Sequence, residues 1–177
     1  MAKIDLSLIQ ELRTRTGLGM MDCRKALEES NGDVDKAIEV LRKKGAAVAA
    51  KRSDKETAQG IVHAYIHPGS LLGVLVEINC ETDFVARTQD MQTFAKDLCM
   101  HIAAIKPLYL SPADVDPKFL EQIIEGKVKK LYSDICLLNQ AFVKNDQLTI
   151  EDAIKELIAK TGENIKIRRF ARFEIGA

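Results

Sequence analysis

Two pairs of residues in this 177-residue chain carry side chains that could do chemistry. His63 and His67 are four residues apart, the spacing of two zinc ligands on a helix. They fall on a β-branched segment and the turn after it, however, and no third ligand is near in sequence. Cys80 and His101 could serve as a thiol nucleophile and its base, but no motif supplies an orienting group or an oxyanion site. We therefore predict no metal site and no catalytic residue.

Phosphate-binding chemistry is not indicated either. The sequence contains no glycine-rich loop of the GxxxxGK[ST] type, so the chain is not expected to bind a nucleotide in that way. We expect no cofactor and no enzymatic activity.

The segment "NCETDFVART", residues 79–88, carries the remaining signal. An apolar segment ends at Asn79, and Phe84 then follows Glu81, Thr82 and Asp83. In one interpretation Phe84 packs into the core and Asp83 caps the next helix. In the other, Phe84 is an exposed anchor for a partner and Asp83 adds directional hydrogen bonds. The residues alone leave both interpretations open.

The first 45 residues have the periodicity of three short amphipathic helices, which predicts a compact helical bundle. The helices are expected over residues 4–16, 20–30 and 34–45. Asp33 is the expected N-cap of the third helix, which Gly45 is expected to close. "AAVAAKRSDKETAQG" then suits a short helix that runs into a linker. A boundary near Asp54 would divide the chain into domains of residues 1–54 and 55–177.

The rest of the chain mixes strands and helices, which predicts an α+β core. "GIVHAYI" and "LLGVLVEIN" indicate two strands of a hairpin, with the turn at "HPGS". Helices are expected over residues 91–105, 117–132 and 150–160. Thr149 is the expected N-cap of the last helix, and Gly162 its stop.

"NIKIRRFARFEIG" indicates a third strand, which would complete a small antiparallel three-stranded sheet with helices on one face. Its alternation predicts one buried side and one mostly charged side that includes Phe170. The residues expected on the buried side are Ile165, Ile167, Ala171, Phe173 and Ile175. The arginines and phenylalanines in "KIRRFARF" also resemble a nucleic-acid-binding strand, but the alternation already accounts for them.

The composition is that of an ordinary soluble globular protein, with 46% hydrophobic and 29% charged residues. Lysine and arginine total 26, as do aspartate and glutamate, so no net field attracts nucleic acid or membrane. The four cysteines form no CxxC pair, and "MAKIDLSLIQ" lacks a secretory pattern, so we expect a cytoplasmic protein with reduced thiols. No apolar run reaches the roughly 18 residues that span a bilayer.

Six segments, in order along the chain, resemble the bacterial translation elongation factor Ts family. They are "LRTRTGLGMMDCRKALEESNGDVDKAIEVLRKKGA", "EINCETDFVAR", "MHIAAIKPLYLSP", "EGKVKKLY", "QAFVKND" and "GENIKIRRFARFEIG". The first looks like that family's ubiquitin-associated-like three-helix module, and the second like its signature. The resemblance implies guanine nucleotide exchange on elongation factor Tu, in its GDP-bound and nucleotide-free forms.

The resemblance also implies which residues contact elongation factor Tu. Thr82, Asp83, Phe84 and Val85 correspond to the segment that enters the partner's GTP-binding domain, where the phenylalanine disturbs the magnesium and phosphate-loop site. Arg13, Met20 and Met21 correspond to contacts of the N-terminal module, and His101 to a histidine of the core.

The chain resembles the short form of the family, whose core domain contains one half-core, whereas long members contain two. This resemblance implies a homodimer in which each chain supplies one half-core. The stretch from Pro117 to Gly126 is shorter than the family pattern, as if a helix were missing. Two other functions remain open. An adaptor acting through the N-terminal bundle would bind through residues 1–54 alone, and a nucleic-acid-binding protein would depend on Arg168, Arg169 and Arg172.

Overall fold

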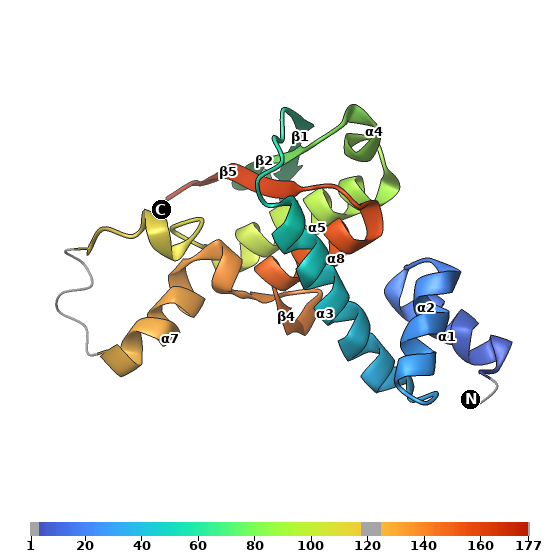
Figure 1. Ribbon diagram of the computed structural model, residues 1–177. Coiled ribbons are helices and arrows are strands. Elements are labelled where there is room, and N and C mark those ends of the chain that lie inside the picture. Colours follow the sequence, from blue (N-terminus) through green and yellow to red (C-terminus); the bar gives the residue numbers. More distant parts are fainter. Residues whose placement is uncertain (1–3, 118–124, 177) are drawn as a thin grey trace. The chain divides into compact units, whose positions relative to one another are not determined.

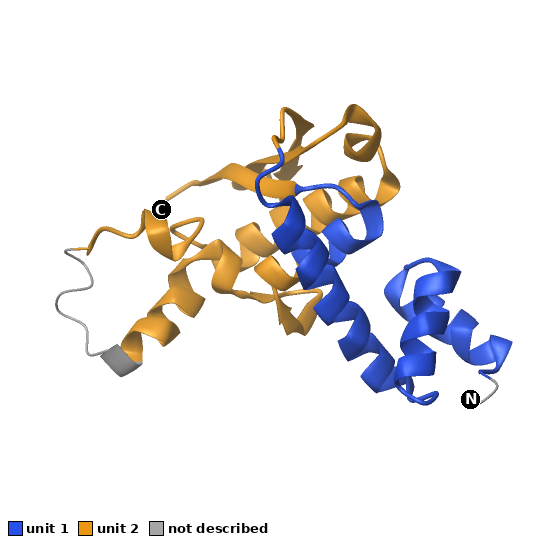
Figure 2. Ribbon diagram, viewed as in Figure 1, with its two compact units in different colours: residues 1–55, 155–164 blue, residues 56–154, 165–177 orange. Residues whose placement is uncertain are grey.

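The computed structural model describes residues 4–117 and 125–176. The chain divides into two compact units, residues 1–55 with 155–164 and residues 56–154 with 165–177 (Figure 2). The predicted α+β class is confirmed, with a helical N-terminal region and a small antiparallel three-stranded sheet (Figure 1). The division into domains 1–54 and 55–177 stays a prediction.

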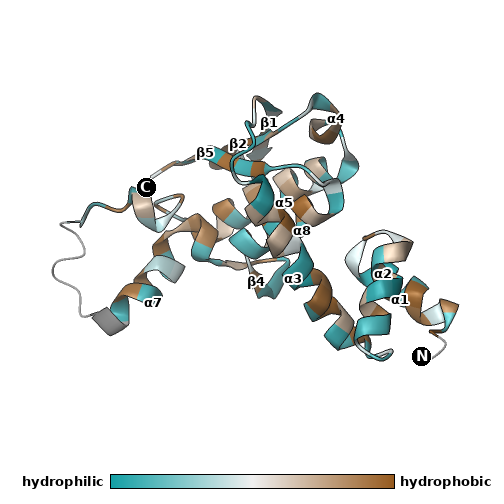
Figure 3. Cartoon of the chain, viewed as in Figure 1, coloured by the Kyte–Doolittle hydropathy of each residue, from teal (hydrophilic) through white to brown (hydrophobic). Residues whose placement is uncertain are grey.

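The first unit contains the three predicted N-terminal helices. They are α1 (Leu6–Thr16), α2 (Met20–Glu29) and α3 (Val34–Arg52). Apolar and polar residues alternate along α3 in the pattern of an amphipathic helix (Figure 3). One side of each helix contributes to a shared apolar core, made of Ile9, Leu12, Cys23, Ala26, Leu27, Ala37 and Leu41.

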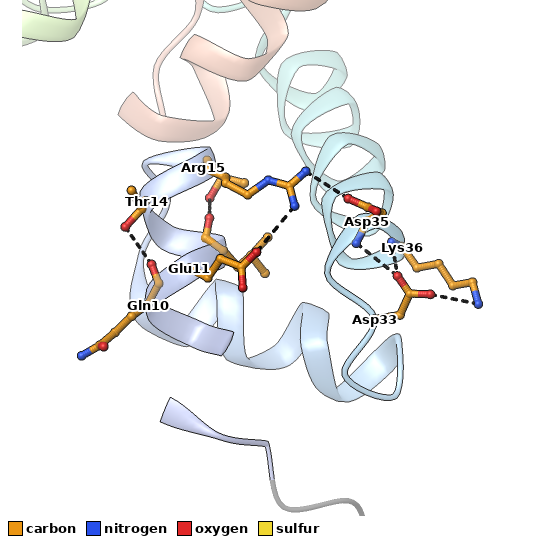
Figure 4. A network of polar contacts seen from close by, with 9 residues as sticks. Gln10, Glu11, Thr14, Arg15, Asp33, Asp35 and Lys36 are labelled. Atoms are coloured by element: carbon orange, nitrogen blue, oxygen red, sulfur yellow. Dashed lines mark hydrogen bonds and ion pairs between the residues drawn. The ribbon is translucent and has the colours of Figure 1, made fainter. Parts of the chain in front are cut away.

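Local polar contacts fix the ends of these helices. Asp33 is the N-cap of α3, as predicted, and its carboxylate accepts hydrogen bonds from the backbone of Asp35 and Lys36, each at 3.1 Å. Arg15 lies between Glu11 on its own helix, at 3.9 Å, and Asp35 on α3, at 3.0 Å (Figure 4). Because these ion pairs are exposed, they orient side chains more than they stabilise the fold.

The predicted end of the third helix at Gly45 is wrong, because α3 continues to Arg52. Glycine inside a helix costs about 1 kcal/mol relative to alanine. Here the missing side chain allows a close approach, since a Cβ atom at Gly45 would lie 3.0 Å from the Cβ atom of Ala159. An ion pair of 3.3 Å between Arg42 and Glu156 accompanies this packing.

The second unit is built on the predicted sheet. Its strands are β1 (Gln59–Ile66), β2 (Leu72–Cys80) and β5 (Ile165–Glu174), in the order β1-β2-β5. Both pairs are antiparallel, which confirms the hairpin and the distant third strand. Helix α5 (Gln89–Ile105) packs against β1 and β2 and covers one face of the sheet.

The pairing of β2 with β5 is interrupted by a β-bulge. Glu77 lies opposite Arg169, whereas the next residue, Ile78, lies opposite Ile167, so Arg168 is the extra residue. Because side chains alternate between the faces of a strand, one extra residue reverses which face each later side chain takes.

The bulge overturns part of the predicted pattern of β5. Ile165 and Ile167 are buried as expected, but Phe173 and Ile175 are 72% and 74% exposed. Phe170, expected on the charged side, lies opposite the buried Val76 and shares its face. The expectation that Ala171, Phe173 and Ile175 continue the buried side is therefore wrong.

The remaining elements complete the second unit. They are the 3₁₀ turns η1 (Pro112–Asp114) and η2 (Leu137–Asn139), helix α7 (Glu125–Ile135), strands β3 (Ala141–Phe142) and β4 (Asn145–Thr149), and the start of α8 (Ile150–Thr161). The helix predicted over residues 117–132 lies partly outside the described residues, and the β3–β4 pair was not predicted. Thr149 caps α8 as expected, because its Oγ1 accepts a hydrogen bond of 3.1 Å from the backbone of Asp152.

In the part of the chain that the structure describes, no helix is long and apolar enough to cross a membrane.

Gly60 is expected to be essential for the packing of β1 on β2. A Cβ atom there would collide with the carbonyl oxygen of Ile78 and lie 2.8 Å from the Cα atom of Asn79. We expect Gly60→Ala to lower the free energy of unfolding by about 3 kcal/mol, measured by urea denaturation. Gly69→Ala is the control, because Gly69 also has a positive φ but open space around it, and should cost about 1 kcal/mol. Equal losses in the two variants would contradict the steric argument.

Candidate functional site

The segment between β2 and α5 forms a single helical turn, α4 (Asp83–Ala86), at the end of the central strand (Figure 1). Thr82 is its N-cap, and its Oγ1 accepts a hydrogen bond of 3.4 Å from the backbone of Val85. Asp83 is therefore the first residue of the helix and not its cap. The sequence suggested a capping role for Asp83 in one interpretation, and the structure gives that role to Thr82.

Phe84 projects from α4 into solvent, with 80% of its surface exposed. The two residues after it are buried, Val85 at 8% and Ala86 at 4% exposed, and they attach the turn to the core. Of the two interpretations of Phe84, packing into the core is excluded by this exposure. An exposed phenylalanine on an anchored turn has the geometry of a binding anchor.

Asp83 lies beside Phe84 and forms an ion pair of 3.0 Å with Arg87, one turn later. Arg87 is largely exposed and Asp83 about half exposed, so the pair contributes little to stability. The pair holds the Asp83 carboxylate on the same side of the turn as Arg87, where about half of its surface remains exposed.

His101 lies in α5 and is completely buried, so it offers no surface to a partner in this structure. Its Nδ1 accepts a hydrogen bond of 3.4 Å from the backbone of Val143, which makes Nε2 the protonated nitrogen, 3.0 Å from the Gln140 side-chain oxygen. The Gln140 amide donates in turn to the carbonyl of Asp134, at 2.8 Å. His101 thus joins α5 to residues 140–143, and its contact with a partner stays a prediction.

Burial lowers the pKa of His101, because the charged imidazolium is poorly solvated there, while the Gln140 hydrogen bond opposes this shift. A protonated Nδ1 would also lose its hydrogen bond from Val143. The neutral form is therefore the one that the fold accommodates.

The predicted contact residues of the N-terminal module are accessible. Met20 and Met21 begin α2 and are 36% and 62% exposed, and Arg13 is exposed on α1. Methionine is flexible and polarizable, which suits an adaptable apolar contact. Neither methionine belongs to the core of the bundle, to which α2 contributes Cys23, Ala26 and Leu27.

The candidate chemistry at histidines and cysteines gains no support. Within residues 4–117 and 125–176, no three His, Cys, Asp or Glu side chains cluster as metal ligands. His67 instead bonds the Tyr65 hydroxyl at 2.9 Å. Cys80 is buried, with its Sγ 3.1 Å from the carbonyl of Thr82. Burial also raises the pKa of Cys99 to about 12, so this thiol stays protonated at neutral pH.

Each arginine of β5 lies within 4 Å of a carboxylate. Glu77 lies 2.7 Å from Arg169 and 3.9 Å from Arg168. The mostly buried Arg172 pairs with Glu174 at 2.8 Å. This pairing does not favour the nucleic-acid-binding interpretation of the strand, which needs unpaired positive charge.

Sequence reasoning missed an apolar surface on the face of the sheet opposite α5. We call it the outer face, and it comprises Val62, Ala64, Ile66, Leu75, Ala171 and Phe173. Val62, Ile66 and Phe173 are 66%, 62% and 72% exposed. A signal was present in "IVHAYI", where apolar residues stand at successive positions and not only at alternate ones.

The family model described as "Elongation factor TS" matches residues 19–122 and 116–177. The chain belongs to the elongation factor Ts family. Elongation factor Ts of Carboxydothermus hydrogenoformans is 48% identical over 194 positions, which cover 98% of this chain and 89% of that relative. Elongation factor Ts of Syntrophus aciditrophicus is also 48% identical, over 98% of this chain and 96% of that relative. Elongation factor Ts of Desulfosudis oleivorans is 46% identical, over 99% of this chain and 100% of that relative.

These members of the elongation factor Ts family contain residues that this chain lacks, because 194 aligned positions exceed its 177 residues. The family match consists of two blocks that overlap at residues 116–122. The location of the shortening at Pro117–Gly126 stays a prediction, and most of this stretch lies outside the described residues.

The stability of the protein should decrease at acid pH because of His101. Its folded pKa lies below its unfolded value of about 6.5, so the stabilisation is present above that pH and is lost as the pH falls toward the folded value. Urea unfolding at pH 7.5, 6.5 and 5.5 should show this decrease, and His101→Gln should reduce it. The exposed His67 provides the control, since His67→Gln should keep the decrease. If the His101→Gln variant loses stability with falling pH as steeply as wild type does, other groups cause the decrease.

Proposed function

We propose that this chain is a guanine nucleotide exchange factor for elongation factor Tu, acting in translation elongation in the cytoplasm. The observation that carries the proposal is the exposed Phe84, held on an anchored helical turn within the segment that resembles the family signature. Membership of the elongation factor Ts family supports the same activity. The proposed activity requires no covalent chemistry on this chain.

In the proposed mechanism, Thr82, Asp83, Phe84 and Val85 meet the GTP-binding domain of elongation factor Tu in its GDP form. Phe84 inserts as an apolar wedge near the magnesium and phosphate-binding loop. Both features hold GDP with strict geometry and tolerate little displacement. A wedge that is already positioned on a rigid core costs little conformational entropy when it binds.

Exchange then follows from linkage between two ligands of one partner. If this chain weakens GDP binding to elongation factor Tu, then GDP weakens the binding of this chain by the same coupling free energy. The chain remains on the nucleotide-free partner until GTP binds and displaces it. The activity is therefore reciprocal displacement and not catalysis of a chemical step.

We assign a second contact to the N-terminal module. Met20 and Met21 are exposed at the start of α2, and Arg13 is exposed on α1 in the same unit. Exposed methionines provide an adaptable apolar surface, and arginine provides directional hydrogen bonds. These residues are proposed to dock on the same GTP-binding domain.

We also propose that two copies of the chain pair through the outer face of the sheet. The resemblance to the short form of the family implies such a homodimer, and the outer face exposes Val62, Ile66 and Phe173 together. An isologous pairing would place the same apolar patch of each copy against the other.

Phe84→Ala should reduce the exchange activity without unfolding the protein, because its side chain is mostly exposed. Release of a fluorescent GDP analogue from elongation factor Tu should slow by about 30-fold or more, the effect of losing roughly 2 kcal/mol at a binding hot spot. Leu108→Ala is the control, since Leu108 is 69% exposed and lies outside the signature segment.

Three results are distinguishable in this experiment. Loss of activity in Phe84→Ala alone supports the wedge. Equal acceleration by wild type and Phe84→Ala supports exchange through other contacts and rejects the wedge. If wild type does not accelerate release, the exchange function is wrong, and binding by residues 1–54 becomes the leading alternative.

Charges on the outer face should separate the proposed homodimer. The double variant Val62→Asp/Phe173→Asp should change the molar mass measured by light scattering from two chains to one, because buried unpaired carboxylates are costly. Leu108→Asp, which adds one carboxylate at an exposed position outside the sheet, should leave the mass unchanged. A wild-type protein that has the mass of one chain would contradict the homodimer directly.

A further inference from the structure

The direction of Phe84 has to be set from outside α4. A helix of four residues has no internal N–H partner for its own carbonyl groups, and so short a helix is not stable alone. The turn therefore depends on what its flanking residues and neighbouring elements contribute.

The backbone of this turn forms hydrogen bonds with the side chains of Thr82, Thr88 and Gln92. Thr82 accepts from the backbone of Val85 at the start of the turn, at 3.4 Å. At its end, the hydroxyl of Thr88 donates to the carbonyl of Val85 at 2.8 Å. The side-chain amide of Gln92 donates to the carbonyl of Ala86 at 3.2 Å.

Gln92 differs from the two threonines in where it lies. Thr82 and Thr88 flank the turn directly, and Thr88 is also the N-cap of α5, because its Oγ1 accepts a bond of 3.3 Å from Met91. Gln92 lies inside α5, whose buried face includes Met91 and Phe94. Its amide therefore connects the turn to a helix that is packed on the sheet.

We propose that Gln92 is a positioning residue for Phe84. By holding the Ala86 carbonyl, it keeps α4 closed and fixes the direction in which the aromatic ring projects. The role of this direction in exchange rests on the proposed function, whereas the holding of the turn does not. Small errors in the placement of a functional group can cost large factors in rate.

Gln92→Glu tests this role with little change in shape. The carboxylate can accept but not donate, so it cannot bond the Ala86 carbonyl. A negative charge near the start of α5 is also favourable to the helix dipole, so α5 itself should not be weakened. Gln92→Met removes the donor without adding charge and serves as a second variant.

Gln89→Glu is the matched control. Gln89 is the first residue of α5, and its amide bonds Thr93 in the same helix at 3.1 Å. The substitution makes the same chemical change at the start of the same helix and leaves the Gln92 bond to Ala86 intact.

The first readout is hydrogen exchange in the free protein. The backbone N–H groups of Ala86 and Arg87 close the turn on Thr82 and Asp83, at 3.3 and 3.2 Å. In Gln92→Glu and Gln92→Met they should exchange about tenfold faster, as expected for the loss of one hydrogen bond, while Gln89→Glu should match wild type.

The second readout is GDP release from elongation factor Tu over a range of concentrations of this protein. The maximal rate should fall about tenfold in both Gln92 variants, while the concentration that gives half of that rate should change less than about twofold. This split is expected because Gln92 sets the position of the wedge and is not itself a contact.

Two results would overturn the proposal. Unchanged hydrogen exchange in both Gln92 variants would show that the amide does not hold the turn. If the maximal rate of GDP release is unchanged and only the half-maximal concentration rises, Gln92 is a direct contact and not a positioning residue. If wild type itself does not release GDP, only the proposed function fails, and hydrogen exchange alone decides the role of Gln92.

Discussion

The pairing of β2 on both of its edges is the constraint on which the second unit depends. β1 and β5 fix this strand along its length, and its side chains at Val74, Val76 and Ile78 are buried. The chain consequently leaves the sheet at one defined point, the buried Cys80. Helix α4 starts three residues later, and α5 then packs across the face of the sheet that carries Val74, Val76 and Ile78. A phenylalanine that would be mobile in an ordinary loop is thereby presented by a strand that cannot shift without breaking two ladders of hydrogen bonds.

Much of this fold could be predicted because its signals are local. The alternation in β1 and β2, the helical spacing in α5 and the caps at Asp33 and Thr149 depend on residues only a few positions apart. Cap residues and turn residues act through hydrogen bonds within one turn of chain, so the neighbouring sequence contains the information. The family signature was also contiguous, which explains why the segment around Phe84 could be singled out before its position was known.

The features that were missed depend on partners far along the chain. The bulge opposite Glu77 joins two strands about 90 residues apart, and nothing inside "KIRRFARF" shows where the extra residue falls. The continuation of α3 beyond Gly45 depends on the close approach of Ala159 to this glycine. Taken alone, the glycine had suggested that the helix ends there. The exposure of Phe84 also follows from its neighbours, because Val85 and Ala86 occupy the apolar positions of the turn. In each case the deciding energy is a packing contact and not a local propensity.

Residues 155–164 belong to the same compact unit as residues 1–55, although the chain builds most of the other unit between them. On the ribosome, Arg42 is made long before its ion-pair partner Glu156, which lies 114 residues later. At about 10 residues per second, the second half of α3 waits on the order of 10 s for these contacts. During that interval Gly45 lies in a helix without its packing partner, where it lowers helix stability. The order of synthesis therefore makes the second half of α3 the last part of the N-terminal helices to become fully stable. In the nascent chain, chaperones and proteases can reach this region.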